Sequence, residues 1–230
     1  MAVFMFGRST PPLFFHKNFA ENSWAEIIKA CQLEEVPDTW LIGDSKPMTI
    51  NGVEYQIDII GKNHDGYSDG TGWAPLTFQL HDCYATKYMM DSSNMNTGGY
   101  SDSEMHKTRL PAILKLMPSE VQIAIRAVNK SSSWGSEIDE IETYASKLFL
   151  LSEIEISGTL SNSFTGEGKQ YQYYKDGKSK VKRVKGSTSQ WWTRSPYAYL
   201  HIQYCAITTG GKPTYLSAEE THGVSFAFCF

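Results

Sequence analysis

One dipeptide constrains the fold of this chain more than any other feature: Asn51-Gly52, which lies between two apolar, strand-like runs. Residues 48–50 form the first run and residues 53–60 form the second. Asparagine and glycine tolerate the positive φ angles of a type I′ turn, and the twist of this turn suits two paired antiparallel strands. We therefore predict a β-hairpin at this point.

Capping signals predict helices that are short. Ser23 and Glu26 have the spacing of a capping box, and apolar residues at helical spacing extend this predicted helix to residue 32. Two more helical stretches are expected, at residues 101–116 with a kink or a break at Pro111 and at residues 118–127.

The remaining segments predict short strands and long loops. Residues 63–99 are rich in Gly, Asp, Asn and Ser and are expected to form ordered loops. Residues 158–186 read as an insertion built around a hairpin, in which Tyr171, Tyr173 and Tyr174 precede a turn at Asp176-Gly177 and an exposed basic run. Strands are expected at 147–151, 153–156, 190–193, 199–208 and 224–230, which gives an α+β fold with antiparallel pairing.

Composition places the chain among globular proteins and limits its partners. Its 230 residues are 41% hydrophobic and 20% charged, so one packed domain is expected. A net charge of -4 provides no basic surface for nucleic acid or an anionic membrane, and neither a signal peptide nor a membrane span is expected. The four cysteines form no CxxC pair, so reduced thiols are expected, while a disulfide between Cys205 and Cys229 stays open.

The first 21 residues differ from the rest of the chain. They combine five phenylalanines with Pro11-Pro12, and such a segment reads as an extended arm whose aromatic side chains need a partner surface. The arm would serve attachment or oligomerisation, or it would pack back on its own domain. Residues 22–230 are expected to form that domain.

Motifs that carry enzymatic chemistry do not occur in the sequence. It has no phosphate-binding loop, dinucleotide fingerprint, HExxH pair or GxSxG motif, so we expect no catalytic residue and no cofactor. The pairs His64-Asp65 and His81-Asp82 lie near Cys83 and Ser92, and we interpret them as loop-packing residues rather than as a nucleophile with its base.

A group of oxygen-bearing side chains surrounds Gly98-Gly99. Such side chains suit a hard cation such as calcium, but their spacing matches no EF-hand. Turns that bond to themselves are the expected interpretation, and no metal site is expected. The residues are Asp91, Asn94, Asn96, Asp102 and Glu104.

The C-terminal third carries the candidate binding residues. Trp191 and Trp192 are adjacent, so their rings should lie on opposite sides of a strand, and Arg194 should pair with a buried acid. Tyrosines follow where loops and strand edges should be exposed, and tyrosine gives recognition surfaces large contact area at low entropy cost. The alternative is a β-core that buries them. The candidate ligand-binding residues are Tyr197, Ala198, Tyr199, Leu200, His201, Ile202, Tyr204, Thr214, Tyr215 and Leu216, of which Tyr197, Tyr199, His201, Tyr204 and Tyr215 should be more exposed than Trp191 and Phe228.

Six segments carry a resemblance to known domains: 40–44, 59–65, 74–82, 147–153, 191–196 and 223–229. They are similar to a family of uncharacterised domains common in prophages and gut Firmicutes, over residues 24–230. The C-terminal half of that family is similar to C-type-lectin-like and formylglycine-generating-enzyme-like folds, which implies short antiparallel strands, two or three helices and long ordered loops. The catalytic cysteines of the formylglycine-generating enzymes have no recognisable motif here.

The chain also resembles the variable proteins of diversity-generating retroelements, such as the major tropism determinant of a phage tail fibre. Those proteins vary exposed residues near the C-terminus, and residues 191–196 and 223–229 bracket the corresponding stretch here. The resemblance implies a phage-encoded or prophage-encoded homo-oligomer, made in the bacterial cytoplasm and carried on the virion with other virion proteins, that binds a host-surface protein or glycan. The alternative is a structural virion component, such as a capsid decoration or tail protein.

Overall fold

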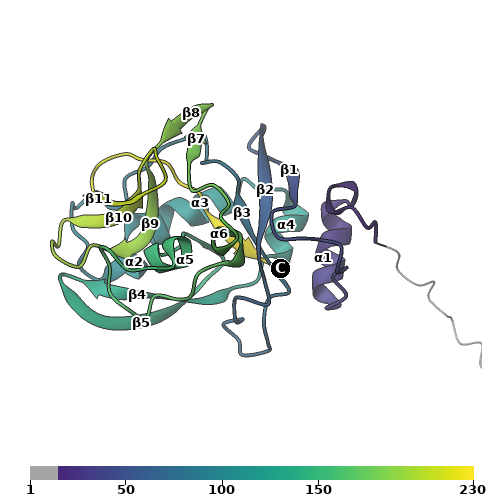
Figure 1. Ribbon diagram of the computed structural model, residues 1–230, viewed down its shortest axis with the longest axis horizontal. Helices are drawn as coiled ribbons and strands as arrows, with labels where there is room; N and C mark the ends of the chain where they lie inside the picture. The colour runs from purple at the N-terminus through teal and green to yellow at the C-terminus, as the bar shows by residue number, and fades with distance from the viewer. Residues whose placement is uncertain (1–14) are drawn as a thin grey trace, which may run out of the picture.

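The computed structural model describes residues 15–230, so the expectations for Phe4, Phe6, Pro11, Pro12 and Phe14 lie outside the described residues. Over the described range the protein has an α+β fold of antiparallel sheets and short helices, as predicted (Figure 1). No helix in this range is long and apolar enough to cross a membrane.

The largest sheet has five antiparallel strands and includes the C-terminal segment. Across the sheet they are β1 (Ser45–Ile50), β2 (Val53–Lys62), β3 (Leu76–Leu80), β12 (Ala227–Cys229) and β6 (Leu148–Phe149). The last strand, β12, pairs with β3 on one side and β6 on the other. The prediction that the C-terminal segment is paired inside a sheet is therefore confirmed.

The predicted hairpin is also confirmed. Ile50 at the end of β1 pairs with Val53 at the start of β2, and Asn51 and Gly52 have φ angles of 48° and 76°. Both central residues of the turn thus have the positive φ that a type I′ turn requires.

We expect Gly52→Ala to lower the free energy of unfolding by about 1 kcal/mol, because an L-residue is strained at positive φ. A Cβ at this position would meet no atom within 4 Å, so the loss would be purely conformational. Denaturant unfolding measures it, with Asn51→Gly as the control that keeps the turn geometry. An equally stable Gly52→Ala variant would contradict the assignment of the turn.

The other sheets are smaller and lie mostly at one end of the molecule. A three-stranded antiparallel sheet contains β9 (Trp191–Pro196), β10 (Gln203–Ile207) and β11 (Pro213–Ser217), with β10 in the middle. In Figure 1 this sheet and the tip of a long hairpin, β4 (Val128–Gly135) with β5 (Ile138–Ser146), form the left end, opposite helix α1 (Trp24–Gln32). A short hairpin pairs β7 (Lys182–Val184) with β8 (Ser187–Ser189).

The helices are short, and α1 begins with the predicted capping box of Ser23 and Glu26. The segment expected to be helical over residues 101–116 is interrupted at Ser103, and of the kink or break predicted at Pro111 the break does not occur, because α3 runs through this residue. Pro111 lies in the first turn of its helix, where a missing N–H costs nothing. The other helical elements are η1 (Phe19–Glu21), α2 (Gly99–Asp102), the π-helical turn η2 (Met105–Arg109), α3 (Leu110–Leu114), α4 (Ser119–Ala124), α5 (Glu153–Ser157) and α6 (Gln172–Lys175).

Two predictions between residues 153 and 186 are wrong. Residues 153–156 form helix α5 rather than a strand, because Ser152 and Glu155 make a capping box. The hairpin of the insertion turns at Lys185-Gly186, whereas residues 172–175 are helical. Lys182, expected on an exposed rim, is buried, and its ammonium donates to the carbonyl oxygens of Leu80 and His81 at 2.6 and 2.7 Å.

The apolar core includes Phe19 near the N-terminus and the two adjacent tryptophans. Phe19 is fully buried with its ring centroid 5.4 Å from that of Trp40, so this part of the N-terminal segment packs on the domain, which is the second of the two alternatives given for it. Trp192 packs in the larger apolar cluster and Trp191 in the smaller, which confirms that they lie on opposite sides of β9. All four cysteines are buried and free.

Candidate functional site

Three tyrosine rings lie together at the end of the molecule formed by β9, β10 and β11. Tyr197 stacks on Tyr215 with ring centroids 4.1 Å apart, and Tyr199 meets Tyr197 edge-on at 5.5 Å. Tyr199 is 71% exposed and Tyr215 is 43% exposed, whereas Trp191 and Phe228 are fully buried. We call Tyr197, Tyr199, Leu200, His201 and Tyr215 the tyrosine surface.

The loop that carries most of this surface is fixed by one buried side chain. The amide nitrogen of Asn96 donates to the carbonyl oxygens of Gln203 and Leu200 at 2.8 and 3.3 Å, and its backbone N–H donates to the carbonyl of His201 at 2.6 Å. Its amide oxygen accepts from the N–H of Ser136, in the turn between β4 and β5, at 2.7 Å. Asn96 therefore holds the tyrosine loop against the β4–β5 turn.

A second buried group holds the neighbouring loop. The carboxylate of Glu153 accepts hydrogen bonds from the backbone N–H groups of Asn162 and Ser163, both at 2.9 Å, and from the hydroxyl of Ser163 at 2.7 Å. The carbonyl of Asn162 in turn accepts from the N–H of Ala198 at 2.9 Å. Glu153, predicted to lie in a strand, has this role because it begins helix α5, and the capping box of Ser152 and Glu155 is the sequence signal that indicates this helix.

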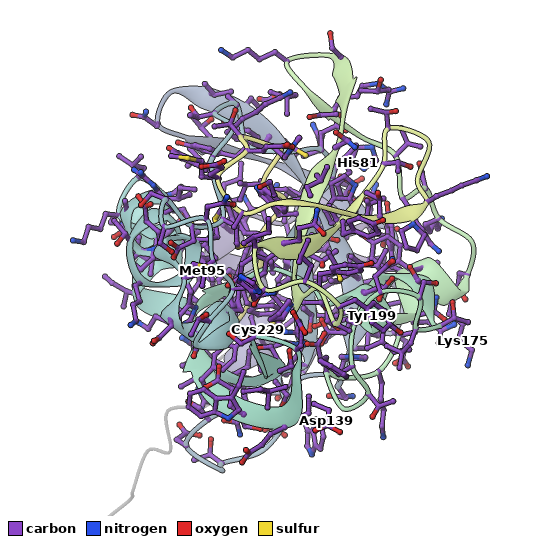
Figure 2. The ribbon with its side chains drawn as sticks, turned by 90° about the vertical axis from the view of Figure 1, so that its left-hand side faces the viewer. His81, Met95, Asp139, Lys175, Tyr199 and Cys229 are labelled. Carbon is purple, nitrogen blue, oxygen red and sulfur yellow. The ribbon has the colours of Figure 1, made fainter. Side chains whose placement is uncertain are left out.

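Exposed apolar side chains extend the tyrosine surface over the same end. Trp134 and Ile138 line a hollow of about 500 Å³ with Thr97 and Gly98. The ring nitrogen Nδ1 of His201 lies 3.6 Å from a carboxylate oxygen of Glu137, in the turn between β4 and β5. Figure 2 looks onto this end, with Met95, Tyr199 and Asp139 labelled. Six of the thirteen exposed large hydrophobic side chains in the described residues come from the tyrosine surface, from β4 and β5, or from the loop that contains Asn96: Met95, Trp134, Ile138, Tyr199, Leu200 and Tyr215.

Some candidate residues do not reach the surface. Tyr204 is 1% exposed and donates its hydroxyl proton to the carbonyl of Gly99 at 2.9 Å, so the prediction that it is exposed is wrong. It lies in β10, the middle strand, and points into the core. Ala198 is buried as well, and Ile202, Thr214 and Leu216 are half-buried. The structure thus brings together Tyr197, Tyr199, Leu200, His201 and Tyr215.

Arg194 pairs with a buried acid, as predicted, and the acid is Glu155. One guanidinium nitrogen lies 2.9 Å from a carboxylate oxygen of Glu155, and a second nitrogen contacts the other oxygen. The ammonium of Lys130 lies 2.7 Å from Glu155 and 2.8 Å from Asp65, which also accepts from the Tyr171 hydroxyl. Burial alone would raise the pKa of Glu155, but the two cations outweigh it and lower that pKa.

The two His-Asp pairs are not assembled with a nucleophile. His64 stacks on Tyr171 with centroids 3.9 Å apart, while Asp65 pairs with Lys130. His81 contacts Asp58 at 2.7 Å rather than its neighbour Asp82, and the hydrogen bond that its ring donates to the Asp58 carboxylate raises the pKa of His81. Burial raises the pKa of Cys83 to about 12, so its thiol stays protonated at neutral pH.

Three of the oxygen-bearing side chains around Gly98-Gly99 bond to residues close to them in the chain, and the other two, Asn94 and Asn96, bond to the C-terminal third. Asp91 accepts from the N–H and hydroxyl of Ser93 at 2.8 and 2.6 Å, Asp102 pairs with Lys107, and Glu104 pairs with Arg109. In residues 15–230, no group of three or more His, Cys, Asp or Glu side chains is arranged to hold a metal ion. The turn interpretation holds for Asp91, whereas Asp102 and Glu104 form ion pairs and Asn96 holds the tyrosine loop.

A comparison with protein families gives one match in this chain. A family model described as "Domain of unknown function (DUF6273)" matches residues 77–229, about two thirds of the chain. No curated protein and no solved structure matches. The matched range contains the whole tyrosine surface, the buried charges of Lys130, Glu155 and Arg194, and the last strand of the main sheet.

Proposed function

Because the chain belongs to the DUF6273 family, whose description gives no activity, we propose from its surface that it is a recognition module that binds a partner through the tyrosine surface and performs no catalysis. The observation that carries this proposal is an exposed aromatic cluster on loops that buried hydrogen bonds already hold in place. Because the loops are already ordered in the free protein, they lose little conformational entropy on binding, and such preorganisation raises affinity.

The composition of the surface favours a protein partner over a glycan. Aliphatic side chains such as Leu200, next to Tyr199, and Ile138, beside Trp134, add contact area without hydrogen-bonding groups for sugar hydroxyls. Charged groups such as Glu137 lie among them, as at the polar rim of an interface.

The proposal includes the setting that the family resemblance implies. A phage-encoded or prophage-encoded protein on a virion would use this surface to attach to a host-surface protein. The proposal also includes a C-type-lectin-like fold. Two features support it: the C-terminal strand lies within the main sheet, and a second antiparallel sheet carries the exposed loops.

The test is binding of the fluorescently labelled chain to a panel of bacterial cells, measured by flow cytometry. We expect Tyr199→Ala and Tyr215→Ala each to raise the half-saturating concentration by roughly tenfold, because hot-spot aromatics contribute about 1–2 kcal/mol or more. Protease treatment of the cells should remove binding, and periodate oxidation of their glycans should not.

The matched control is Trp73→Ala, which removes an exposed aromatic ring from a different loop. It should bind cells like the unmodified chain. Equal binding by all three variants would refute recognition through the tyrosine surface. A different outcome is that the unmodified chain does not bind cells and that Tyr199→Ala lowers the particle mass in light scattering. The surface would then join copies of the chain, as in a structural virion component.

A further inference from the structure

Strand β11 forms one edge of the three-stranded sheet, at the same end of the molecule as the tyrosine surface (Figure 1). On one side it pairs with β10 in a regular antiparallel register without a bulge, and no strand of the described residues pairs with its other side. None of its five residues is buried. The backbone groups along its outer side are therefore open to another molecule.

The register with β10 shows which backbone groups of β11 point outward. The N–H of Thr208 donates to the carbonyl of Lys212 at 2.8 Å, and this pair continues the register of the two strands by one step. Bonded pairs recur at every second residue of an antiparallel ladder, so the even-numbered residues of β11 bond to β10. The odd-numbered residues, Pro213, Tyr215 and Ser217, therefore turn their backbone groups to the outer side.

Four of these outward groups have no hydrogen-bond partner in residues 15–230. They are the carbonyl of Pro213, the N–H and the carbonyl of Tyr215, and the N–H of Ser217. The two other outward positions have nothing to offer a partner. Proline has no N–H, and the carbonyl of Ser217 already accepts from the N–H of Glu220 at 3.0 Å.

This set of groups is its own complement under a two-fold axis that passes beside Tyr215. In an antiparallel pair of two β11 strands centred there, the two Tyr215 residues exchange both of their N–H···O=C bonds, and the N–H of each Ser217 meets the carbonyl of the other Pro213. The N–H that Pro213 lacks would face the Ser217 carbonyl that Glu220 already occupies. Every free group thus gains a partner, and no occupied group is required to change.

The charges along the edge also favour a second copy. Edge strands are usually protected from pairing by charged residues or proline within the strand. Strand β1 has Lys46 and Pro47, and β5 has three acidic residues, whereas β11 has no charge and its proline is the first residue. Lys212 and Glu219 flank β11 and are exposed, and the antiparallel pairing places Lys212 of each copy near Glu219 of the other.

We infer that two copies of this chain associate through their β11 edges into one continuous antiparallel sheet. The two Tyr215 rings then lie side by side across the two-fold axis, each stacked on its own Tyr197. This inference goes beyond the proposed function, because the pairing uses backbone groups and leaves Tyr199 exposed for a partner. A dimer would present two tyrosine surfaces on one side and could hold a partner with two copies of a target bivalently.

The direct test follows backbone amide signals in ¹⁵N-¹H NMR spectra as the protein concentration rises from about ten micromolar to about one millimolar, a range suited to a small transient interface. We expect the signals of Tyr215 and Ser217 to shift and their hydrogen exchange to slow severalfold. Those of Thr214 and Leu216, already bonded to β10, should change less. Sedimentation should show a mass that rises from 25.9 kDa toward twice that value. A constant mass of 25.9 kDa would overturn the inference.

Charge variants at the two-fold axis identify the occupant of the edge as a second copy. Tyr215→Lys and Tyr215→Glu should each stay near 25.9 kDa over this range, because two like charges would face each other across the axis. An equimolar mixture of the two should regain the mass of the dimer, which an edge that binds an extended segment of a different protein would not do. Because Tyr215 is 43% exposed, both variants should melt close to the temperature of the unmodified chain.

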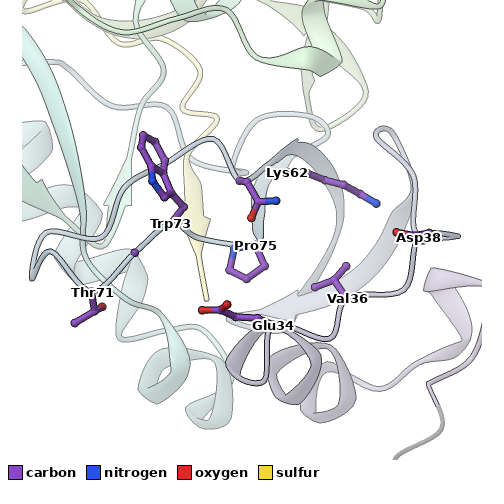
Figure 3. A pocket seen from close by; sticks show the side chains of 9 residues that line it. Glu34, Val36, Asp38, Lys62, Thr71, Trp73 and Pro75 are labelled. Atoms are coloured by element: carbon purple, nitrogen blue, oxygen red, sulfur yellow. The ribbon is translucent and has the colours of Figure 1, made fainter.

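The matched controls are Trp73→Lys and Trp73→Glu, which place the same charges on another exposed ring, beside a cleft lined by Val36 and Pro75 (Figure 3). They should associate like the unmodified chain. Ser217→Pro removes an outward donor from each copy and keeps the Tyr215 ring, so it should weaken association roughly tenfold. It should leave the binding of cells by a single copy unchanged, which separates this inference from the proposed function. Tyr215 variants that associate like the controls, or a mixture that does not regain the dimer mass, would overturn the inference.

Discussion

We expect Arg194→Met to lower the free energy of unfolding by about 3–5 kcal/mol, enough to leave a domain of ordinary stability partly unfolded. Arg194 is fully buried, and its guanidinium bonds to Glu155 and to the carbonyl oxygens of Ser131, Leu150 and Glu167. Methionine fills similar volume but supplies no donor. The carboxylate of Glu155 and three buried carbonyl groups would lose a partner at once.

The physical cause is the charge balance of the buried cluster. Arg194 and Lys130 carry two positive charges, and Asp65 and Glu155 carry two negative charges, all with little access to water. Removing one cation leaves a buried carboxylate uncompensated, which costs more than the ion pair itself contributes. Because Arg194 lies in β9, three residues before Tyr197, where the loop begins, the loss should also loosen the tyrosine surface.

Urea unfolding followed by tryptophan fluorescence measures the effect. Arg194→Lys should rescue only part of the stability, because an ammonium cannot reproduce the paired contacts of a guanidinium. The double variant Arg194→Met with Glu155→Gln should lose less than the sum of the two single losses, since the uncompensated charge is gone. If Arg194→Met unfolds at the same urea concentration as the unmodified chain, the buried ion pair contributes nothing to the free energy of unfolding.

Local signals in the sequence predicted local structure well. The turn at Asn51-Gly52 and the capping box at Ser23 depend on residues within four positions of each other, and both occur as expected. The same kind of signal occurs at Ser152, but Ile154 and Ile156 alternate like strand residues, and this alternation predicts a strand where the structure has a helix. A competing short-range pattern decided that error.

Long-range contacts determine the rest, and the sequence does not show them. The hydrogen bonds of Asn96 to residues 200–203 span more than a hundred positions, so nothing near Asn96 indicates that it holds the tyrosine loop. The exposure of Tyr199 and the burial of Tyr204 depend on where β10 begins, and it begins at Gln203 rather than at Tyr199. That a buried acid would meet Arg194 could be predicted from the cost of an unpaired buried charge, but its identity as Glu155 could not.

We expect Glu167→Gln to stabilise the protein by roughly 3 kcal/mol at pH 8 and to have little effect near pH 5. Glu167 is fully buried, accepts from the backbone N–H of Ser133 at 3.0 Å and contacts the hydroxyl of Ser195. Burial raises its pKa from 4.5 to about 7, although Ser195 and Arg194 oppose that change. The charges of Lys130 and Arg194 are already balanced by Asp65 and Glu155, so a third carboxylate is tolerated best in its protonated form.

The direction of the pH dependence follows from proton binding. Between pH 4.5 and about 7 the folded protein keeps the proton of Glu167, whereas the unfolded chain releases it, so the free energy of unfolding falls as the pH rises through this window. Glutamine has no proton to lose and keeps an amide oxygen for Ser133, so the variant lacks this slope. His81, whose pKa is raised in the folded state, also loses its stabilising contribution as the pH rises, which is why the comparison must be between the two proteins at each pH. Urea unfolding of both proteins at pH 5, 6, 7 and 8 should give a difference in the free energy of unfolding that grows with pH and levels off above about 7. A difference that is constant across this range would show that Glu167 is ionised in the folded protein throughout and that other contacts compensate for its burial.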